Sequence, residues 1–192
     1  VAKAGFRTVT FDQPAHGRSV KKDNVNRSNL PEFCRALCAV ARETGPLHAV
    51  IGHSLGAAAA ILSAGGSPVA LEGGIVPARL VSVSSPSGLK SIIDGFCRMH
   101  GIPDRSEDLI EGIERKCGFP RAIYDAGPAL RATGARIMIV HDRDDWVIPF
   151  DEALKLQEAC SGARLVATEK SRHRDILVNR IMLRAVKDFL AD

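Results

Sequence analysis

The chain has 192 residues, of which 45% are hydrophobic and 25% are charged, as expected for one globular domain. Its net charge of +4 comes from scattered basic residues that do not cluster with aromatic side chains, which argues against a nucleic-acid-binding surface. No apolar run approaches the roughly 20 residues that a membrane-spanning helix needs, so we expect no membrane span.

The five cysteines are odd in number and show no paired spacing. Cys34 and Cys38 lie one helical turn apart, which fits either a fragment of a metal site or packing in the core. We favour the core, because free cysteine is among the most often buried residue types. We therefore expect reduced thiols, a cytoplasmic setting, and neither a metal nor a cofactor.

The first predicted strand covers residues 6–11, which are rich in β-branched and aromatic side chains. It leads into the polar loop D-Q-P-A-H-G-R-S at residues 12–19, where the simplest role for His16 is a hydrogen bond that orders the loop. The chain opens on V-A-K-A-G without an initiating Met and enters this strand at once. We therefore expect a chain that is incomplete at its N-terminus.

A helix is predicted to begin after Asn29. This residue is a good N-cap, Pro31 suits the first turn, and Glu32 lies three residues beyond the cap. The dipeptide Gly45-Pro46 is expected to end the helix, because glycine favours a helix C-terminus and proline cannot continue one.

The central stretch of the sequence joins a strand to a helix. Apolar residues 47–51 predict a buried strand, the motif G-H-S-L-G follows, and an alanine-rich helix comes next. Ser54 then lies on a sharp turn at a helix N-terminus, where unpaired N–H groups face any oxyanion formed beside it. We expect Gly52 and Gly56 to be needed because side chains would crowd the turn.

Further strands are predicted at residues 79–84, 135–140 and 164–168, and further helices at about 150–160 and 175–190. Strands that alternate with helices indicate an α/β fold with a mostly parallel sheet and helices on both faces. The length suits a single domain that spans residues 1–192.

Residues 86–128 have a helical pattern, and the segment is too long for an ordinary connection between two strands. We interpret this segment as a small helical lid inserted into the domain. A plain pair of packing helices is an equally good interpretation on loop length alone.

Four segments of the sequence carry a resemblance to a known family: D-Q-P-A-H-G-R-S, G-H-S-L-G, H-D-R-D-D-W-V-I-P and S-R-H-R-D-I-L. Together they resemble the α/β-hydrolase superfamily, in its serine-nucleophile, esterase-like branch. In that fold the nucleophile, the acid and the histidine follow in this order, each after a strand. The sequence departs from the family at Ala15, Asp142 and Arg172, which stand where the family has glycine.

The resemblance implies a site residue by residue. Ser54 would be the nucleophile, His173 the base, and Asp145 the acid that orients it, with Asp142 and Asp144 left open as alternatives to Asp145. The Leu55 N–H would be one oxyanion donor. The family's second donor comes from a His-Gly loop and further strands that have no counterpart before the first residue of this chain.

The same resemblance implies an arrangement of the strands. A family strand from that N-terminal part lies between the strand that matches residues 6–11 and the elbow strand at 47–51. We therefore expect strands 47–51, 79–84, 135–140 and 164–168 to form one continuous parallel sheet, with residues 6–11 displaced or weakly paired.

The implied function is cleavage of a carboxylic ester or related acyl bond through an acyl-enzyme intermediate, on a small-molecule acyl substrate. An acyltransferase, a thioesterase or an amidase would use the same three residues, and a non-catalytic binding member of the fold is the alternative of another class. Phe96, Met99, Phe119 and Trp146 indicate an apolar acyl pocket. The sequence gives no sign of the oligomeric state.

Overall fold

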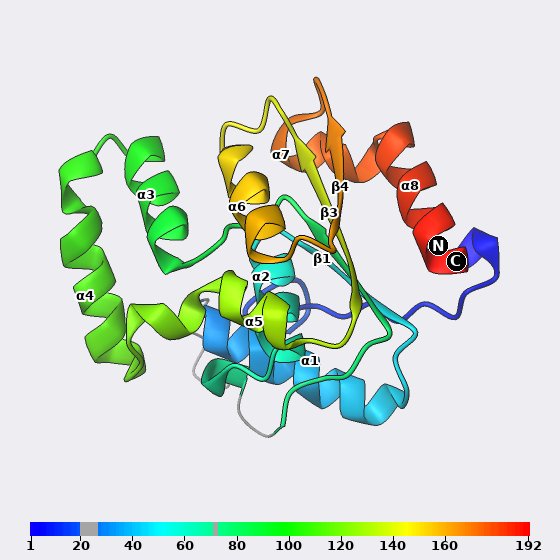
Figure 1. The fold of residues 1–192 in the computed structure, drawn as a ribbon. Coiled ribbons are helices and arrows are strands. Elements are labelled where there is room, and N and C mark those ends of the chain that lie inside the picture. Colours follow the sequence, from blue (N-terminus) through cyan, green and yellow to red (C-terminus); the bar gives the residue numbers. More distant parts are fainter. Residues whose placement is uncertain (20–26, 71–72) are drawn as a thin grey trace.

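A computed structural model describes residues 1–19, 27–70 and 73–192 (Figure 1). Its sheet has the order β1-β2-β3-β4 and all neighbouring strands are parallel, which confirms the predicted continuous sheet. The strands are β1 Ala49–His53, β2 Arg79–Val83, β3 Arg136–Asp142 and β4 Arg164–Thr168. The α-helices are α1 Leu30–Thr44, α2 Leu55–Ala64, α3 Leu89–Met99, α4 Ser106–Cys117, α5 Ala126–Ala132, α6 Asp151–Ala159, α7 Arg172–Asp175 and α8 Arg180–Ala191.

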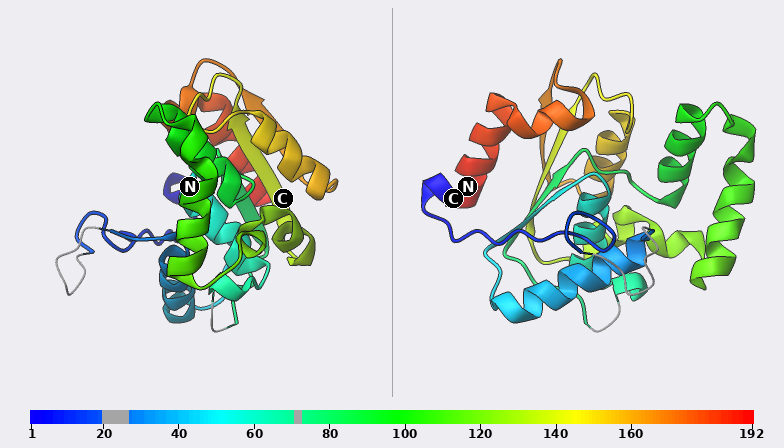
Figure 2. Two further views of the ribbon diagram at one scale, coloured as in Figure 1. Left: turned by 90° about the vertical axis from the view of Figure 1, so that its left-hand side faces the viewer. Right: turned by 180° about the vertical axis from the view of Figure 1, so that it is seen from behind.

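Both faces of the sheet are covered by helices, as the alternating pattern predicts (Figures 1 and 2). Successive residues of a strand point to opposite faces. Ile137 and Ile139 of β3 pack into the cluster under α1, α2, α5 and α6, whereas Met138 and Val140 pack into the cluster under α8. The central strands β2 and β3 are therefore apolar on both sides and fix the sheet in the middle of the domain.

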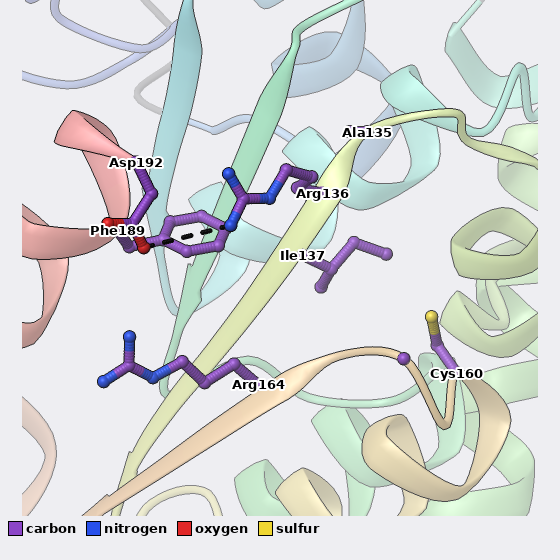
Figure 3. Close-up of a pocket in the computed structure, with 8 residues that line it drawn as sticks. Ala135, Arg136, Ile137, Cys160, Arg164, Phe189 and Asp192 are labelled. Atoms are coloured by element: carbon purple, nitrogen blue, oxygen red, sulfur yellow. Dashed lines mark ion pairs between the residues drawn. The ribbon is translucent and has the colours of Figure 1, made fainter.

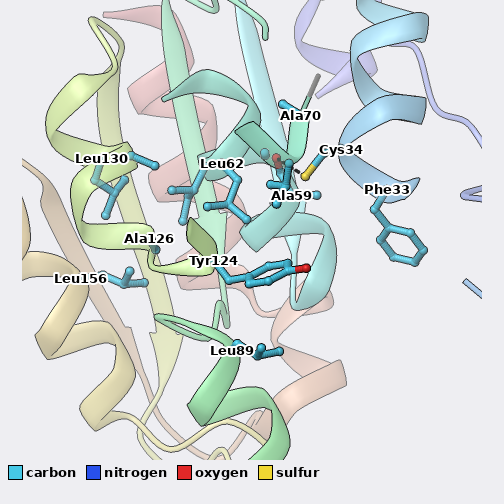
Figure 4. Close-up of a cluster of buried hydrophobic side chains, with 14 of the residues drawn as sticks. Phe33, Cys34, Ala59, Leu62, Ala70, Leu89, Tyr124, Ala126, Leu130 and Leu156 are labelled. Carbon is cyan, nitrogen blue, oxygen red and sulfur yellow. Dashed lines mark hydrogen bonds between the residues drawn. The ribbon is translucent and has the colours of Figure 1, made fainter. Parts of the chain in front are cut away.

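The larger core cluster is built around the alanine-rich helix α2 (Figure 4). Ala59 and Leu62 are fully buried in this cluster, which also contains Leu130 of α5 and Leu156 of α6. Cys34 also lies in this cluster and is fully buried, which confirms core packing for this thiol, and burial raises its pKa to about 12. Small side chains on α2 allow close packing on the sheet, and this holds the helix N-terminus in place.

Helix α1 begins and ends where the sequence predicts. The Asn29 side chain accepts a hydrogen bond from the Glu32 N–H at 2.9 Å, and Pro31 lies in the first turn. Gly45 forms the C-cap with φ 81°, a left-handed value that glycine adopts without strain.

Residues 6–11 form no strand in the structure, so the prediction of a first strand is wrong. The prediction that these residues are displaced from the sheet is confirmed. A cavity of about 590 Å³ lies between this segment, α1 and β1. Of these residues, Phe6 packs against the rest of the domain. Its ring is 5.3 Å from that of His48, and its side chain contacts the core cluster under α8. A strand needs a neighbour to satisfy its backbone, and the cavity separates these residues from β1.

Helices α3 and α4 pack against each other and project from one side of the sheet (Figures 1 and 2). The contact between this pair and the main body includes Gly95, where an added Cβ would meet the Val147 carbonyl oxygen at 3.1 Å. The predicted helical segment at 86–128 therefore contains α3, α4 and the first three residues of α5, and α3 touches the loop that follows β3.

The predicted C-terminal helix is divided in the structure. Helix α7 and a 3₁₀ turn at Ile176–Val178 come first, and Asn179 then starts α8. The Asn179 side chain accepts hydrogen bonds from the N–H groups of Ile181 and Met182 at 2.8 and 3.1 Å, which makes it an N-cap. The amphipathic pattern continues across the break, so periodicity alone does not reveal it.

Candidate active site

Ser54 lies at the turn between β1 and α2. Its backbone has φ 56° and ψ −125°, a strained conformation for a residue other than glycine, and its N–H donates to the Val83 carbonyl at 2.9 Å. Gly52 is required here, because an added Cβ would lie 2.5 Å from the Ala57 Cα. The expectation for Gly56 is wrong: a Cβ there would meet no described atom within 4 Å.

Of the three residues expected in the site, His173 lies within hydrogen-bonding distance of the other two. Ser54 Oγ is 3.0 Å from His173 Nε2, and His173 Nδ1 is 2.7 Å from Asp145 Oδ2. Asp145 follows β3 and His173 follows β4, so both lie at the carboxyl end of the parallel sheet, beside the turn after β1. Asp145 is 5% exposed and His173 9% exposed, which excludes most water from their contact.

The second oxygen of Asp145 is held by the backbone. Oδ1 accepts the N–H groups of Val147 at 3.0 Å and Ile148 at 2.9 Å. Burial acts to raise the pKa of Asp145, but the hydrogen bonds from His173 and Ile148 outweigh it and keep this pKa below its usual value. Asp145 is therefore a carboxylate at neutral pH and favours an N–H on His173 Nδ1.

The other two aspartates of the loop face away from the imidazole. Asp144 Oδ2 accepts the Lys170 N–H at 2.7 Å. Asp142 is fully buried and accepts four hydrogen bonds from the β3–α6 loop and from the end of β4 and the loop after it. Of the three candidate acids, Asp145 is the one in contact with His173.

Two further histidines lie around this constellation. His53 Nε2 is 2.8 Å from the His173 carbonyl oxygen, and the two rings are 4.9 Å apart. His141 is fully buried, with Nε2 2.9 Å from the Ile148 carbonyl oxygen and 3.6 Å from Asp145 Oδ2. No role was assigned to either histidine from the sequence. His53 belongs to the motif G-H-S-L-G and His141 to H-D-R-D-D-W-V-I-P, and this was the sequence signal that places both near the site.

The Leu55 N–H belongs to the first turn of α2 and follows directly after Ser54. Within the described residues no acceptor is recorded for it. A backbone N–H at a helix N-terminus has no intrahelical acceptor, so it can donate to an oxygen placed beside the turn.

A family model of the alpha/beta hydrolase family matches residues 1–183. The chain belongs to the α/β-hydrolase family. No curated protein matches its sequence. An esterase from Pyrococcus furiosus is 19% identical, covers 98% of this chain with 72% of its own length, and has a TM-score of 0.62. A meta-cleavage product hydrolase from Pseudomonas fluorescens is 17% identical. The match covers 92% of this chain and 76% of that one, with a TM-score of 0.63.

Some of the structural neighbours are much longer than this chain. An acylaminoacyl peptidase from Pyrococcus horikoshii is 11% identical with a TM-score of 0.55, and the matched region is 81% of this chain but 25% of that one. For an esterase domain from Rhodothermus marinus the chain spans 64% of the relative's length. At these identities the likeness shows the fold.

Two cavities of the domain lie away from Ser54, Asp145 and His173, none of which lines either one. One is the cavity along β1. The other, of about 260 Å³, lies at the opposite end of the sheet, where β3 and β4 begin (Figure 3). There the Arg136 guanidinium lies over the Phe189 ring and 3.9 Å from an Asp192 oxygen. Ligands of parallel α/β sheets bind at the carboxyl ends of the strands, which is the end that holds Ser54.

Of the residues expected in an apolar pocket, Phe96, Met99 and Trp146 are exposed, whereas Phe119 packs against the core. Among the described residues no group of three or more His, Cys, Asp or Glu side chains could hold a metal ion. In the described ranges no helix combines the length and apolar character that a membrane crossing requires.

Acidification from pH 7 to pH 5 is expected to destabilise the folded protein. Burial lowers the pKa of both His53 and His141, so the unfolded chain takes up protons below about pH 6.5 that the folded chain does not. Each histidine can remove at most about 1.4 kcal/mol of stability per pH unit in this window, and the partly exposed His53 less. Urea unfolding at pH 7, 6 and 5 measures the slope.

The His53→Gln variant should flatten this pH dependence, whereas His100→Gln, at an exposed position after α3, should leave it unchanged. A free energy of unfolding that stays constant from pH 7 to 5 in the unmodified protein would contradict the prediction.

Proposed function

We propose that the chain is a serine hydrolase that cleaves a carboxylic ester or a related acyl bond through an acyl-enzyme intermediate. The observation that carries the proposal is the chain of contacts from Ser54 Oγ to His173 Nε2 at 3.0 Å and from His173 Nδ1 to Asp145 at 2.7 Å. A nucleophile bonded to a base, with the base oriented by a third group, is the general arrangement for activating a serine.

In this mechanism Ser54 Oγ attacks the substrate carbonyl carbon while its proton passes to His173 Nε2. The Asp145 carboxylate accepts the Nδ1–H and stabilises the positive imidazolium that results. Collapse of the tetrahedral intermediate breaks the acyl bond, and the leaving group takes the proton from Nε2. Water then attacks the acyl-Ser54 ester by the same steps and releases the acid.

The Leu55 N–H is the oxyanion donor that this proposal assigns. An oxyanion donor at this position is worth about 10²–10³ in rate. It requires no rearrangement, because the first turn of α2 already presents the N–H without an intramolecular partner in the described residues.

We also propose that residues 86–128 act as a lid and that the substrate is a small molecule with an apolar acyl group. Gly95 of α3 lies against the Val147 carbonyl, one residue beyond Trp146. The side chains of Phe96, Met99 and Trp146 are 43%, 49% and 65% exposed. An apolar acyl group would remove such surface from water on binding.

The test is labelling with a fluorophosphonate probe, which reacts with base-activated serines. We expect Ser54 to be labelled and the Ser54→Ala variant to lose labelling while its thermal unfolding midpoint stays within a few degrees. Labelling that persists in Ser54→Ala, or a folded unmodified protein that is not labelled, would contradict the proposal. Turnover of p-nitrophenyl acetate, butyrate and octanoate then measures the preferred acyl length.

A further inference from the structure

We infer that Asp142 is a positioning residue for the active site: its buried carboxylate joins the loop that carries Asp145 to the loop that carries His173. This inference deepens the proposed function and rests on it for its catalytic consequence. The geometric part concerns the position of an imidazole and can be measured separately.

Four donors converge on the Asp142 carboxylate, which is fully buried. Oδ2 accepts the Thr168 hydroxyl at 2.7 Å and the Ser171 N–H at 3.0 Å. Oδ1 accepts the Arg172 N–H at 3.0 Å and the Asp144 N–H at 3.1 Å. A buried carboxylate costs several kcal/mol unless hydrogen bonds replace its water, and here each oxygen receives two.

These donors come from the two segments that carry the predicted acid and base: the loop after β3, and the end of β4 with the start of α7. Asp144 directly precedes Asp145, and the Asp145 N–H itself donates to the Asp142 carbonyl at 3.2 Å. Arg172 directly precedes His173. One side chain at the end of β3 therefore sets the distance between the residue before the acid and the residue before the base.

The loop before His173 needs such a support. Lys170 and Arg172 have φ values of 63° and 57°, in the left-handed region that costs an L-residue about 1–2 kcal/mol relative to the right-handed one. Strained backbone of this kind persists where surrounding contacts fix it. Asp142 fixes the Arg172 N–H, and the His53 ring holds the His173 carbonyl from the other side.

Asp142→Asn is the direct test. The asparagine NH₂ replaces a carboxylate oxygen that accepted two donors. At least one backbone N–H therefore faces another donor in the variant, because a backbone N–H cannot accept a hydrogen bond. We expect kcat per active site, counted by fluorophosphonate titration, to fall by about 10–100-fold, with KM changed less than about twofold, because a misplaced catalytic group costs up to about 10² in rate. The imidazole ¹⁵N signals of His173 should move from the Nδ1–H tautomer toward an average of both.

The matched control is Asp151→Asn, an exposed aspartate at the start of α6, for which we expect turnover and imidazole signals to stay as in the unmodified protein. Rescue comes from Asp142→Asn combined with Arg172→Gly, because glycine adopts φ 57° without support. The kcat of the double variant should be at least about tenfold higher than that of Asp142→Asn alone. The reason is that a supported loop and an unstrained loop both place His173 correctly.

A folded Asp142→Asn protein with unchanged imidazole signals, or with unchanged kcat per titrated site, overturns the inference. If that variant does not fold, Thr168→Val removes one donor and keeps the side-chain shape, and it should shift the same signals in the same direction; unchanged signals would again overturn it. If the unmodified protein neither labels nor turns over substrate, the proposed function fails, and the imidazole signals alone then decide the role of Asp142.

Discussion

Replacement of Asp145 by asparagine is expected to lower kcat by about 10⁴-fold without unfolding the protein. The asparagine oxygen can keep the hydrogen bonds from Val147 and Ile148, so its NH₂ then faces His173 Nδ1. Nδ1 must then be the acceptor, and the proton moves to Nε2, where it blocks removal of the Ser54 proton. Ester turnover at saturating substrate, with circular dichroism as the check on folding, measures the effect.

Asp144→Asn is the matched comparison, because Asp144 is the adjacent residue and its carboxylate contacts the Lys170 N–H instead of the imidazole. We expect its kcat to fall less than about tenfold, since no reacting group loses a partner. If the large loss appears in Asp144→Asn and not in Asp145→Asn, the acid has been assigned to the wrong residue.

Gly52→Ala is expected to destabilise the fold by about 3 kcal/mol or more, which is at the upper end for overpacking. The added Cβ would lie 2.5 Å from both the Ala57 Cα and the Gly56 carbonyl oxygen, and neither backbone atom can swing aside as a side-chain end would. For a chain of this size the melting temperature should fall by about 6–12 °C. Differential scanning calorimetry of the two proteins measures it.

Gly56→Ala, four residues away, should behave in the opposite way. The added Cβ meets no described atom within 4 Å, and alanine favours a helix over glycine by up to about 1 kcal/mol. A melting temperature equal to or slightly above that of the unmodified protein is therefore expected. Equal destabilisation by both substitutions would show that the turn, and not the contact at Gly52, determines the effect.

The sequence by itself determined where the strands of the sheet lie along the chain. The apolar runs at β2 and β3 face core on both sides, so their patterns are continuous and their positions were predictable within two residues. Local chemistry also set the start of α1, because the Asn29 cap and the first-turn proline act within a few residues. The break in the C-terminal helix at Asn179 was missed because its apolar stripe continues across it.

Residues 6–11 show where local propensity is not enough. Their side chains favour a strand, but a strand forms only when a neighbour accepts its backbone hydrogen bonds. A cavity of about 590 Å³ lies between them and β1, so they form no strand. Propensity describes one segment, whereas pairing is a property of two.

Which of the three aspartates contacts His173 depends on tertiary structure alone. Asp142, Asp144 and Asp145 lie within four residues and carry the same group, so the sequence could order them only by resemblance. Their carboxylates point to different partners because the end of β3 turns sharply there and the loop after β4 supplies donors from residues 168–172. Contacts between residues 26–30 positions apart depend on how two strands are placed side by side, and neither segment encodes that placement alone.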